Sequence, residues 1–256
     1  MAIRARKHFS QNFLTNTDVI EQIAAAINPA QTDHILEIGP GRGAITDFLV
    51  GSGCHLDLVE IDRDLVNRLE ALYPNVMIYS EDILKFDLAR IDSPTPIRVV
   101  GNLPYNISTP LLFKLFQHSE CIKDLTFMLQ LEVVNRIVAQ PSSKSYGRLS
   151  IMSQYHCDAE KLFQIPSTAF TPKPKVESAL IRLTPRRNPS LVASNLELLG
   201  QILISAFSKR RKTVRNALAS YLSAEDLQHL NIDTGLRPEN LSPDDYVRCA
   251  NFLSDR

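Results

Sequence analysis

The chain has 256 residues, of which 44% are hydrophobic and 22% charged, as in an ordinary globular protein with one large domain or one large and one small domain. No apolar run approaches the length of a membrane span, and the basic N-terminus lacks the apolar core of a signal peptide. The four cysteines lie far apart and form no C-x-x-C pair, which disfavours a disulfide framework and a metal site. We therefore expect a cytoplasmic protein with no metal and no membrane partner.

Opposite charges balance to a formal net charge of zero, but the cations are unevenly distributed. Residues 1–17 carry Arg4, Arg6 and Lys7 and no acidic residue, and residues 209–215 also carry cations alone. Two basic clusters in a neutral chain fit nucleic-acid binding at a defined face, and they equally fit the solvated surface of a helix. The second cluster consists of Lys209, Arg210, Arg211, Lys212 and Arg215.

The first predicted elements surround a glycine-rich turn. A helix capped by Thr17 is followed by a strand at 34–38, the sequence GPGRG at 39–43, and a helix at 44–50. Bare backbone at such a turn lets a ligand approach closely, and the third glycine lets the helix pack tightly on the strand. The glycines lack the G-x-G-x-x-G spacing of a dinucleotide fingerprint, and no P-loop lysine follows, so hydrolysis of ATP or GTP is disfavoured.

Acidic residues stand at the ends of the next two predicted strands. Glu60, at the end of the strand 55–61, is placed to accept hydrogen bonds from ribose hydroxyls, whereas Asp62 is expected to cap the helix that follows. Asp82 comes after the strand 76–79. It is either an acceptor for an adenine amino group or a loop acid that caps the chain locally.

The fourth predicted strand, 97–100, runs into the loop Gly101–Tyr105, the most distinctive segment of the chain. Asn102 offers a side-chain carbonyl acceptor, Pro104 keeps the loop from continuing as a paired strand, and Tyr105 offers a flat face for stacking. These properties suit a planar ring that bears an exocyclic amine, such as adenine. The alternative is an ordinary strand-to-loop transition in which Asn and Pro are turn formers.

The second half of the chain continues with strands and helices and then becomes all helical. We expect a helix capped by Thr109, strands at 125–129, 159–164 and 178–183, a helix at 147–156 and a linker at 185–189. Beyond the linker, the pattern predicts helices at 196–207, 209–222 and 243–253 and a short one from Ala224.

The segment 170–175 contains an aromatic residue, Phe170, and two cations, Lys173 and Lys175, between stiffening prolines. One interpretation is a rigid connector. The other is a second stacking ring with phosphate contacts beside it.

Seven strands with intervening helices predict a doubly wound α/β domain, which we place at 1–187, followed by a helical C-terminal domain at 188–256. A Rossmann dehydrogenase would share the glycine turn and the acid after the second strand. Three features disfavour a dehydrogenase. They are the spacing of the glycines, the loop Gly101–Tyr105 after the fourth predicted strand, and the lack of an obvious His or Lys constellation for hydride transfer. A nucleoside whose ribose and adenine meet Glu60 and Asp82, with a methyl group directed at Asn102 and Tyr105, would be S-adenosyl-L-methionine.

The chain resembles the ribosomal RNA small subunit adenine N6-dimethyltransferase family over nearly its whole length, with the motifs in the family's order. They are QNFL at 11–14, EIGPGRG at 37–43, VEID at 59–62, GNLPYNISTP at 101–110, FMLQ at 127–130, YGRLS at 146–150, FTPKPKVESA at 170–179 and RRKTVRNAL at 210–218. The resemblance implies a Rossmann-like class I S-adenosylmethionine-dependent methyltransferase domain with a small all-helical C-terminal domain.

Carried over position by position, the resemblance implies a cofactor site and a substrate site. Asn102 and the carbonyl of Leu103 would accept the hydrogens of the target amine, and Tyr105 and Phe170 would sandwich the flipped adenine. The residues implied around S-adenosyl-L-methionine are Asn12, Leu14, Gly39, Glu60, Asp82 and Asn102.

The implied RNA contacts are Lys173, Lys175 and the basic cluster at 209–215, with the domain 188–256 contacting RNA or the ribosome. Two departures from the family pattern are visible. Ser10 stands where glycine is usual, and Leu131 stands where lysine is usual, which removes a cation near the fifth strand.

The activity implied is dimethylation of the N6 amines of two adjacent adenosines in a hairpin loop near the 3′ end of 16S rRNA in the 30S particle, by a monomer with a role in ribosome biogenesis. A large-subunit rRNA adenine methylase of the macrolide-resistance type is the first alternative, but the leucine of NLPY and the FTPKPKV loop favour the small-subunit enzyme. A DNA adenine methylase would usually have D-P-P-Y. A ribosome-assembly factor that acts by binding is the remaining alternative, although the intact NLPY and glycine motifs favour retained activity.

Overall fold

The structure, a computed structural model, describes residues 11–189, 191–208 and 211–256. Contacts between residues divide the chain into two compact units. The first comprises the chain up to Val134 together with Asp158–Pro185, and the second comprises Asn135–Cys157 with Arg186–Arg256. The boundary expected between residues 187 and 188 is a division by function, and it stays a prediction.

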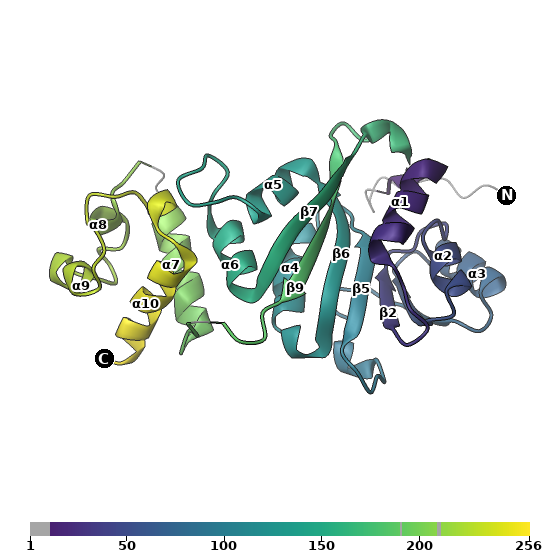
Figure 1. Cartoon of the computed structure of the whole chain (residues 1–256), viewed down its shortest axis with the longest axis horizontal. Coiled ribbons are helices and arrows are strands. Elements are labelled where there is room, and N and C mark those ends of the chain that lie inside the picture. The colour runs from purple at the N-terminus through teal and green to yellow at the C-terminus, as the bar shows by residue number, and fades with distance from the viewer. Residues whose placement is uncertain (1–10, 190, 209–210) are drawn as a thin grey trace. The chain divides into compact units, whose positions relative to one another are not determined.

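A seven-stranded sheet forms the centre of the first unit. Its strands are β2 (His34–Ile38), β3 (His55–Glu60), β4 (Met77–Ser80), β5 (Ile97–Asn102), β6 (Ile122–Gln130), β7 (Cys157–Ile165) and β9 (Ser178–Pro185). They lie in the order β4-β3-β2-β5-β6-β9-β7, of which Figure 1 shows β7, β9, β6, β5 and β2 side by side. Strands β2 to β6 pair in parallel, and β9 runs antiparallel to β6. The seven predicted strands and the doubly wound α/β fold are thus confirmed.

The strand order reverses between β2 and β5, which places a crevice at their carboxyl ends. Ile38 pairs with Gly101, so the turn after β2 and the loop after β5 meet at this crevice. A Cβ atom on Gly101 would collide with the carbonyl oxygen of Ile38. Glycine at this position therefore permits the close approach of the two strand ends.

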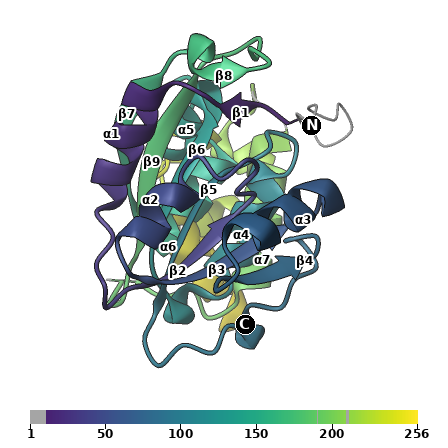
Figure 2. The same ribbon diagram turned by 90° about the vertical axis from the view of Figure 1, so that its right-hand side faces the viewer.

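A second, two-stranded sheet joins the N-terminal segment to the segment 170–175. It consists of β1 (Phe13–Leu14) and β8 (Phe170–Thr171), which pair antiparallel and lie next to each other in Figure 2. The side chains of Phe13 and Leu14 are each 7% exposed. Both residues are therefore packed against the body of the first unit, through a strand pairing that was not predicted from the sequence.

The helices of the first unit are α1 (Thr17–Ile27), α2 (Thr46–Gly51), α3 (Arg63–Leu72) and α4 (Ser108–Phe116), and α5 (Leu131–Ile137) crosses into the second unit. The cap of α1 is Asn16, whose side chain accepts the N–H of Val19, and not Thr17. Asp62 caps α3 as expected, by accepting the N–H of Asp64. Short 3₁₀ helices lie at Leu88–Arg90, Ser119–Cys121, Ser167–Ala169 and Pro238–Asn240.

The expected cap of α4 at Thr109 is wrong. The helix begins at Ser108, after Ile107, because the chain starts to coil already at Pro104. The N–H of Ile107 and the hydroxyl of Ser108 both donate to the Pro104 carbonyl, at 3.1 Å each. The loop after β5 is therefore tied directly to the first turn of α4.

The core of the first unit covers both faces of the sheet, since all five residues of β2 are buried. On one face, Ile23 and Ile27 of α1 pack with Ile35 of β2 and Leu58 of β3. Full burial of such a side chain is worth about 1.5–3 kcal/mol. This packing makes the carboxyl edge of the sheet a rigid platform for the loops above it.

The second unit is helical in its C-terminal part, as expected. Its helices are α6 (Arg148–His156), α7 (Leu196–Ser208), α8 (Val214–Ala217), α9 (Ala224–His229) and α10 (Pro243–Ser254). The expected helix 209–222 is wrong in its described residues, because only α8 is helical there. The N–H of Val214 donates to Leu236 of a following loop at 2.7 Å, so the backbone does not coil before this point. No helix of the described chain has the length and apolarity needed to cross a membrane.

Candidate active site

The glycine turn after β2 presents bare backbone at the crevice. Gly39, Gly41 and Gly43 have φ angles of +64°, +59° and +90°, the left-handed region that favours glycine. A Cβ atom on Gly43 would lie 2.5 Å from the hydroxyl of Tyr73, so the helix side of the turn has no room for a side chain. The guanidinium of Arg42 lies over the ring of Phe13, 4.3 Å from its centroid, and joins the turn to β1.

Glu60 ends β3 with its carboxylate directed to the glycine turn. It accepts the N–H of Gly41 at 3.3 Å and the N–H of Asp62 at 3.0 Å. The residue is 5% exposed, and this burial raises the pKa of its carboxyl above the ordinary value, against the effect of the backbone hydrogen bonds. Each carboxylate oxygen keeps further lone pairs, so Glu60 can accept additional hydrogen bonds from a ligand.

Asn102 ends β5, and its amide group is held in one orientation. The Nδ2 atom donates to the backbone carbonyl of Asn12 at 3.0 Å, an assignment that rests on this hydrogen bond. Because the nitrogen is engaged by the N-terminal segment, the carbonyl oxygen Oδ1 is the end of the amide left to accept from a ligand. The next residue, Leu103, is anchored through its N–H to the carbonyl of Met128 at 3.2 Å.

The segment after β4 is fixed by its own hydrogen bonds and by α4. Asp82 Oδ1 accepts the N–H of Leu84 at 3.0 Å, so this acid caps its local turn. The ammonium group of Lys114 donates to the carbonyl of Ile83 at 2.8 Å and to that of Phe86. Asp82 also lines the cavity described below, so both interpretations of this residue are compatible with its position.

Tyr105 and Phe170 have different environments. The hydroxyl of Tyr105 lies 2.9 Å from the hydroxyl of Ser178, which fixes the far end of the half-buried ring. Phe170 is 3% exposed and packs in the core with Leu14. Tyr105 lines the cavity and Phe170 does not. The stacking role of Phe170 therefore stays a prediction, one that requires the ring to become accessible.

A cavity of about 220 Å³ joins these segments at the carboxyl ends of β2, β3 and β5 and beyond the end of β4. Its walls come from the segment before α1, the glycine turn, the residues after β3 and β4, and the loop after β5. All of the residues expected around the cofactor line it, and so do three of the four expected at the substrate, with Asn102 in both sets: Asn12, Leu14, Gly39, Glu60, Asp82, Asn102, Leu103 and Tyr105.

Glu37 lines the cavity and was not predicted as a site residue, although it lies in the EIGPGRG motif. It is 2% exposed, and its Oε2 accepts the hydroxyl of Thr46 at 2.7 Å. Burial raises the pKa of its carboxyl to about 7, and repulsion from Glu60 and Asp47 acts in the same direction. The sequence did contain a signal for it, namely an acidic residue in the predicted strand, two residues before the first glycine of the turn.

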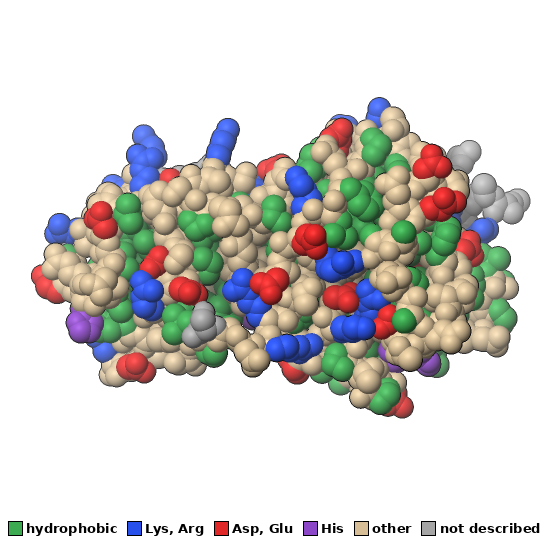
Figure 3. Space-filling view, viewed as in Figure 1, with side chains coloured by type: hydrophobic (Ala, Val, Ile, Leu, Met, Phe, Trp, Pro, Cys, Tyr) green, Lys and Arg blue, Asp and Glu red, His purple; other side chains and the backbone are tan. Residues whose placement is uncertain are grey.

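The described cations that are expected to contact RNA are divided between the two units. Lys173 and Lys175 are exposed in the first unit, and Arg211, Lys212 and Arg215 are exposed in the second. On the face shown in Figure 3, Lys and Arg side chains are interspersed with Asp and Glu. The remaining expected cations and one departure lie outside the described residues: Arg4, Arg6, Lys7, Ser10, Lys209 and Arg210.

The other departure, Leu131, begins α5 directly after β6. It is half-buried, and its N–H donates to the carbonyl of Glu177 at 2.9 Å. Its backbone therefore links the end of β6 to the segment before β9.

Comparison with known proteins identifies relatives over the whole chain. The model of one family, described as ribosomal RNA adenine dimethylase, matches residues 2–255. Three proteins named ribosomal RNA small subunit methyltransferase A are similar to this chain. That of Coxiella burnetii is 51% identical over 97% of this chain and 98% of its own. That of Marinobacter nauticus is 49% identical over 98% of this chain and 92% of its own. That of Pseudomonas aeruginosa is 48% identical over 98% of this chain and 96% of its own.

Solved structures share the fold. A dimethyladenosine transferase from Plasmodium falciparum has a TM-score of 0.81 at 25% identity, over 95% of this chain and 98% of that one. The 23S rRNA methyltransferase ErmE has a TM-score of 0.72 at 25% identity, over 95% and 100%. The Rossmann-like methyltransferase fold and the cofactor expected from the sequence are thereby confirmed. The chain belongs to the ribosomal RNA adenine dimethylase family of S-adenosylmethionine-dependent methyltransferases.

Proposed function

We propose that this protein dimethylates the N6 amines of two adjacent adenosines in a hairpin loop near the 3′ end of 16S rRNA. It would act as a cytoplasmic monomer on the 30S particle during ribosome biogenesis, without a catalytic metal. The observation that carries the proposal is the amide of Asn102, which is fixed through Nδ2 with its acceptor oxygen left for a ligand at the edge of the cavity. The similarity to small subunit methyltransferases favours this substrate over the large subunit.

The residues of the cavity fit S-adenosyl-L-methionine. Among the residues that the structure describes, the backbone carbonyl oxygen of Asn102, at 3.8 Å, would be the one non-adjacent neighbour within 4 Å of a Cβ atom on Gly39, so this bare backbone leaves space for a ligand. The buried carboxylate of Glu60 would accept ribose hydroxyls, and Asp82 would accept an adenine amine. Asn12 and Leu14 complete the wall. When bound, the cofactor supplies an electrophilic methyl group on a sulfonium.

The amino nitrogen of adenine is a poor nucleophile because its lone pair is delocalised into the ring. Asn102 Oδ1 and the carbonyl oxygen of Leu103 would accept its two hydrogens and so favour a tetrahedral nitrogen with a directed lone pair. Both acceptors are held in place before the substrate arrives, by Asn12 and by Met128. Rate enhancement then comes from positioning and fixed dipoles, and no acid or base with a tuned pKa is needed.

The target base must leave its stack before the loop can bind it, which costs a few kcal/mol and less in a single-stranded loop. Tyr105, held through Ser178, would offer one stacking face, worth about 1–3 kcal/mol per base. Phe170 would offer the second face once β8 shifts. This cost is the reason a hairpin loop is a more suitable substrate than a duplex.

We propose that residues 1–187 carry out the transfer and that residues 188–256 contact rRNA. Lys173 and Lys175 would reach phosphates beside the catalytic loop. The cluster Lys209, Arg210, Arg211, Lys212 and Arg215 would reach others. Phosphate contacts of this kind position the RNA without reading its sequence.

One experiment tests the proposal. The full chain is incubated with radiolabelled S-adenosyl-L-methionine and with under-methylated 30S subunits, 50S subunits or duplex DNA, and labelled bases are mapped. We expect N6-dimethyladenosine at two adjacent positions of 16S rRNA in the 30S sample alone. Label in 23S rRNA would support the large-subunit alternative, and label in DNA a DNA methylase. Binding to 30S subunits without transfer would support an assembly factor.

A further inference from the structure

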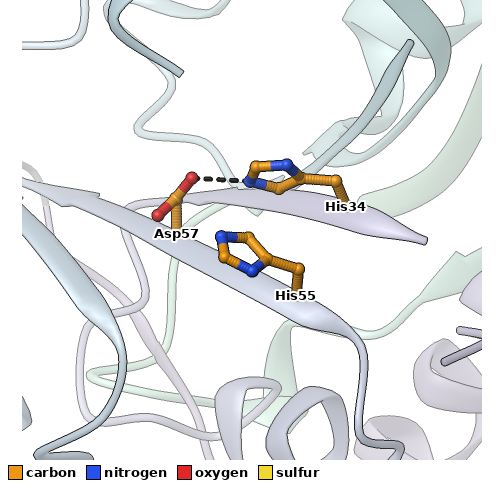
Figure 4. A group of neighbouring side chains, drawn as sticks. All are labelled: His34, His55 and Asp57. Atoms are coloured by element: carbon orange, nitrogen blue, oxygen red, sulfur yellow. Dashed lines mark hydrogen bonds and ion pairs between the residues drawn. The ribbon is translucent and has the colours of Figure 1, made fainter. Parts of the chain in front are cut away.

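Two histidines and an aspartate gather at the amino-terminal edge of the sheet, away from the cavity. His34 is the first residue of β2 and His55 the first residue of β3, and the two pair across the parallel ladder. Asp57 lies two residues further along β3, so its side chain is on the same face as that of His55. Figure 4 shows the three side chains facing one another across the two strands.

The three side chains are close enough to share one ligand. The Nε2 atom of His34 lies 2.7 Å from Oδ2 of Asp57, and the rings of His34 and His55 are 4.1 Å apart between centroids. One possible ligand atom from each residue can be chosen so that all lie within 4.8 Å of one another. His34 and Asp57 are 6% and 3% exposed, whereas His55 is exposed, so the group opens to solvent on one side.

We propose that His34, His55 and Asp57 bind a divalent transition-metal ion of the Zn²⁺ type, with water completing the coordination. Imidazole nitrogens with a single carboxylate suit Zn²⁺, whereas Mg²⁺ and Ca²⁺ prefer oxygen ligands alone. Tetrahedral ligands at about 2.1 Å from an ion lie about 3.4 Å apart. Since the three ligand atoms lie within 4.8 Å of one another, the widest pair would have to close by at most about 1.4 Å. The exposed side chain of His55 can make that adjustment.

Metal binding would replace a hydrogen bond that already exists. Nε2 of His34 and Oδ2 of Asp57 are joined by a hydrogen bond of 2.7 Å. An ion bound to both atoms takes the place of the hydrogen between them, which passes to the other ring nitrogen of His34 or to solvent, and the two atoms become ligands. The sheet has therefore already oriented two of the three ligands.

The site is separate from methyl transfer. It lies where β2 and β3 begin, and the cavity lies where they end, about 13 Å along β2 at the usual rise per residue. A bound ion would join the starts of β2 and β3 and stabilise the fold by mass action. The expectation of no metal rested on the cysteines, and strand pairing between residues 21 positions apart leaves no spacing signal for a histidine site.

The test is titration of the chelator-treated full chain with ZnCl₂ in a calorimeter, with the melting temperature measured in parallel. We expect one ion per chain and a melting temperature that rises with zinc concentration. His55→Ala is the informative variant, because His55 is exposed and its removal leaves the buried His34–Asp57 pair intact. We expect this variant to bind zinc at least tenfold more weakly and to keep the wild-type rate of methyl transfer.

Two matched variants locate the ion. His229→Ala removes another exposed histidine, and Cys121→Ser removes an exposed thiol that could itself bind zinc. Both should bind zinc like the wild type. Equal affinity of His55→Ala and the wild type, or loss of binding in Cys121→Ser instead, would overturn the proposal. Co²⁺ provides an independent readout, because its visible absorption should change on binding to the wild type and stay that of the aqueous ion with His55→Ala.

Discussion

The amide Nδ2 of Asn102 donates a hydrogen bond to the backbone carbonyl of Asn12, 3.0 Å away and 90 residues earlier in the chain. This contact links the catalytic loop to the N-terminal segment, which β1 in turn ties to β8 and Phe170. The orientation of one amide therefore depends on the docking of a segment that precedes the first helix. Asn12 in the wall of the cofactor cavity and Asn102, the acceptor for the substrate, are thus held by the same hydrogen bond.

Substitution of Gly39 separates backbone strain from ligand contact. Gly39→Ala forces a left-handed conformation, which costs about 1–2 kcal/mol, and adds a methyl group to the turn that lines the cavity. We expect cofactor affinity to fall at least tenfold in calorimetry. Gly53→Ala is the matched control, because φ there is +74° but the residue lies outside the cavity. It should lose similar stability and keep cofactor affinity; an equal loss of affinity in both would refute a direct role for Gly39.

Lys114 should affect cofactor binding indirectly, because it holds in place the segment that follows Asp82. Lys114→Met keeps the aliphatic stem but removes the hydrogen bonds to Ile83 and Phe86. We expect the cofactor Kd to rise severalfold and the rate at saturating cofactor to stay unchanged, with about 1–2 kcal/mol lost in stability.

The control for this variant is Lys123→Met. Lys123 is 57% exposed and pairs with Asp33, so its replacement should cost less than about 1 kcal/mol and leave cofactor binding alone. A Lys114→Met protein with wild-type cofactor affinity would show that the segment holds its position without the lysine.

Glu37 makes stability depend on pH. Its pKa is raised to about 7 from 4.5, mainly by burial, so the folded state favours the protonated form. The stability that this provides is complete below pH 4.5 and is lost as the pH rises to about 7. In Glu37→Gln the side chain cannot ionise and carries no such penalty. As the pH rises from 4.5 to about 7, the free energy of unfolding of the variant should therefore increase relative to that of the wild type by up to about 3 kcal/mol. Urea unfolding at pH 5 and pH 8 measures this; a difference independent of pH would contradict the assignment.

The basic cluster at 209–215 should affect the binding of RNA and should not affect the binding of the cofactor. Replacing Lys212 and Arg215 by Gln removes two exposed cations, so affinity for 30S subunits should fall and its dependence on salt should become shallower by about two units of slope. Lys144→Gln removes an exposed lysine outside this basic cluster and serves as the control. Filter binding over a range of salt concentrations gives both slopes. Identical slopes for all three proteins would exclude this cluster from the interface.

The fold was predictable where short-range patterns determine it. Each apolar strand followed by Gly, Pro or an acid was recognised, and so was the cap at Asp62. The pairing of Leu14 with Phe170 joins residues 156 positions apart and involves strands of two residues, which leave no periodic signal. The segment 209–222 has helical spacing, yet at Val214 the hydrogen bond to Leu236 determines the backbone.

Residues that face the ligand could be predicted because they stand in recognisable motifs. The residues that hold them in position could not be predicted as well. Motifs pointed to Glu60, Asp82 and Asn102, which meet at the cavity. The support given by Lys114 was not visible, because a lysine that bonds to backbone carbonyls resembles any other helical lysine in a sequence. Gly101 is required by the neighbouring strand, and strand neighbours cannot be read from local sequence.

The central claim is that Asn102 accepts from the target amine. The most direct measurement compares Asn102→Ala with the wild type in labelled methyl transfer to under-methylated 30S subunits, and in cofactor binding by calorimetry. Asn67→Ala, an exposed asparagine on α3, is the control. We expect Asn102→Ala to lose more than about a hundredfold in rate and to keep cofactor affinity largely unchanged. A near-normal rate for Asn102→Ala would contradict the account.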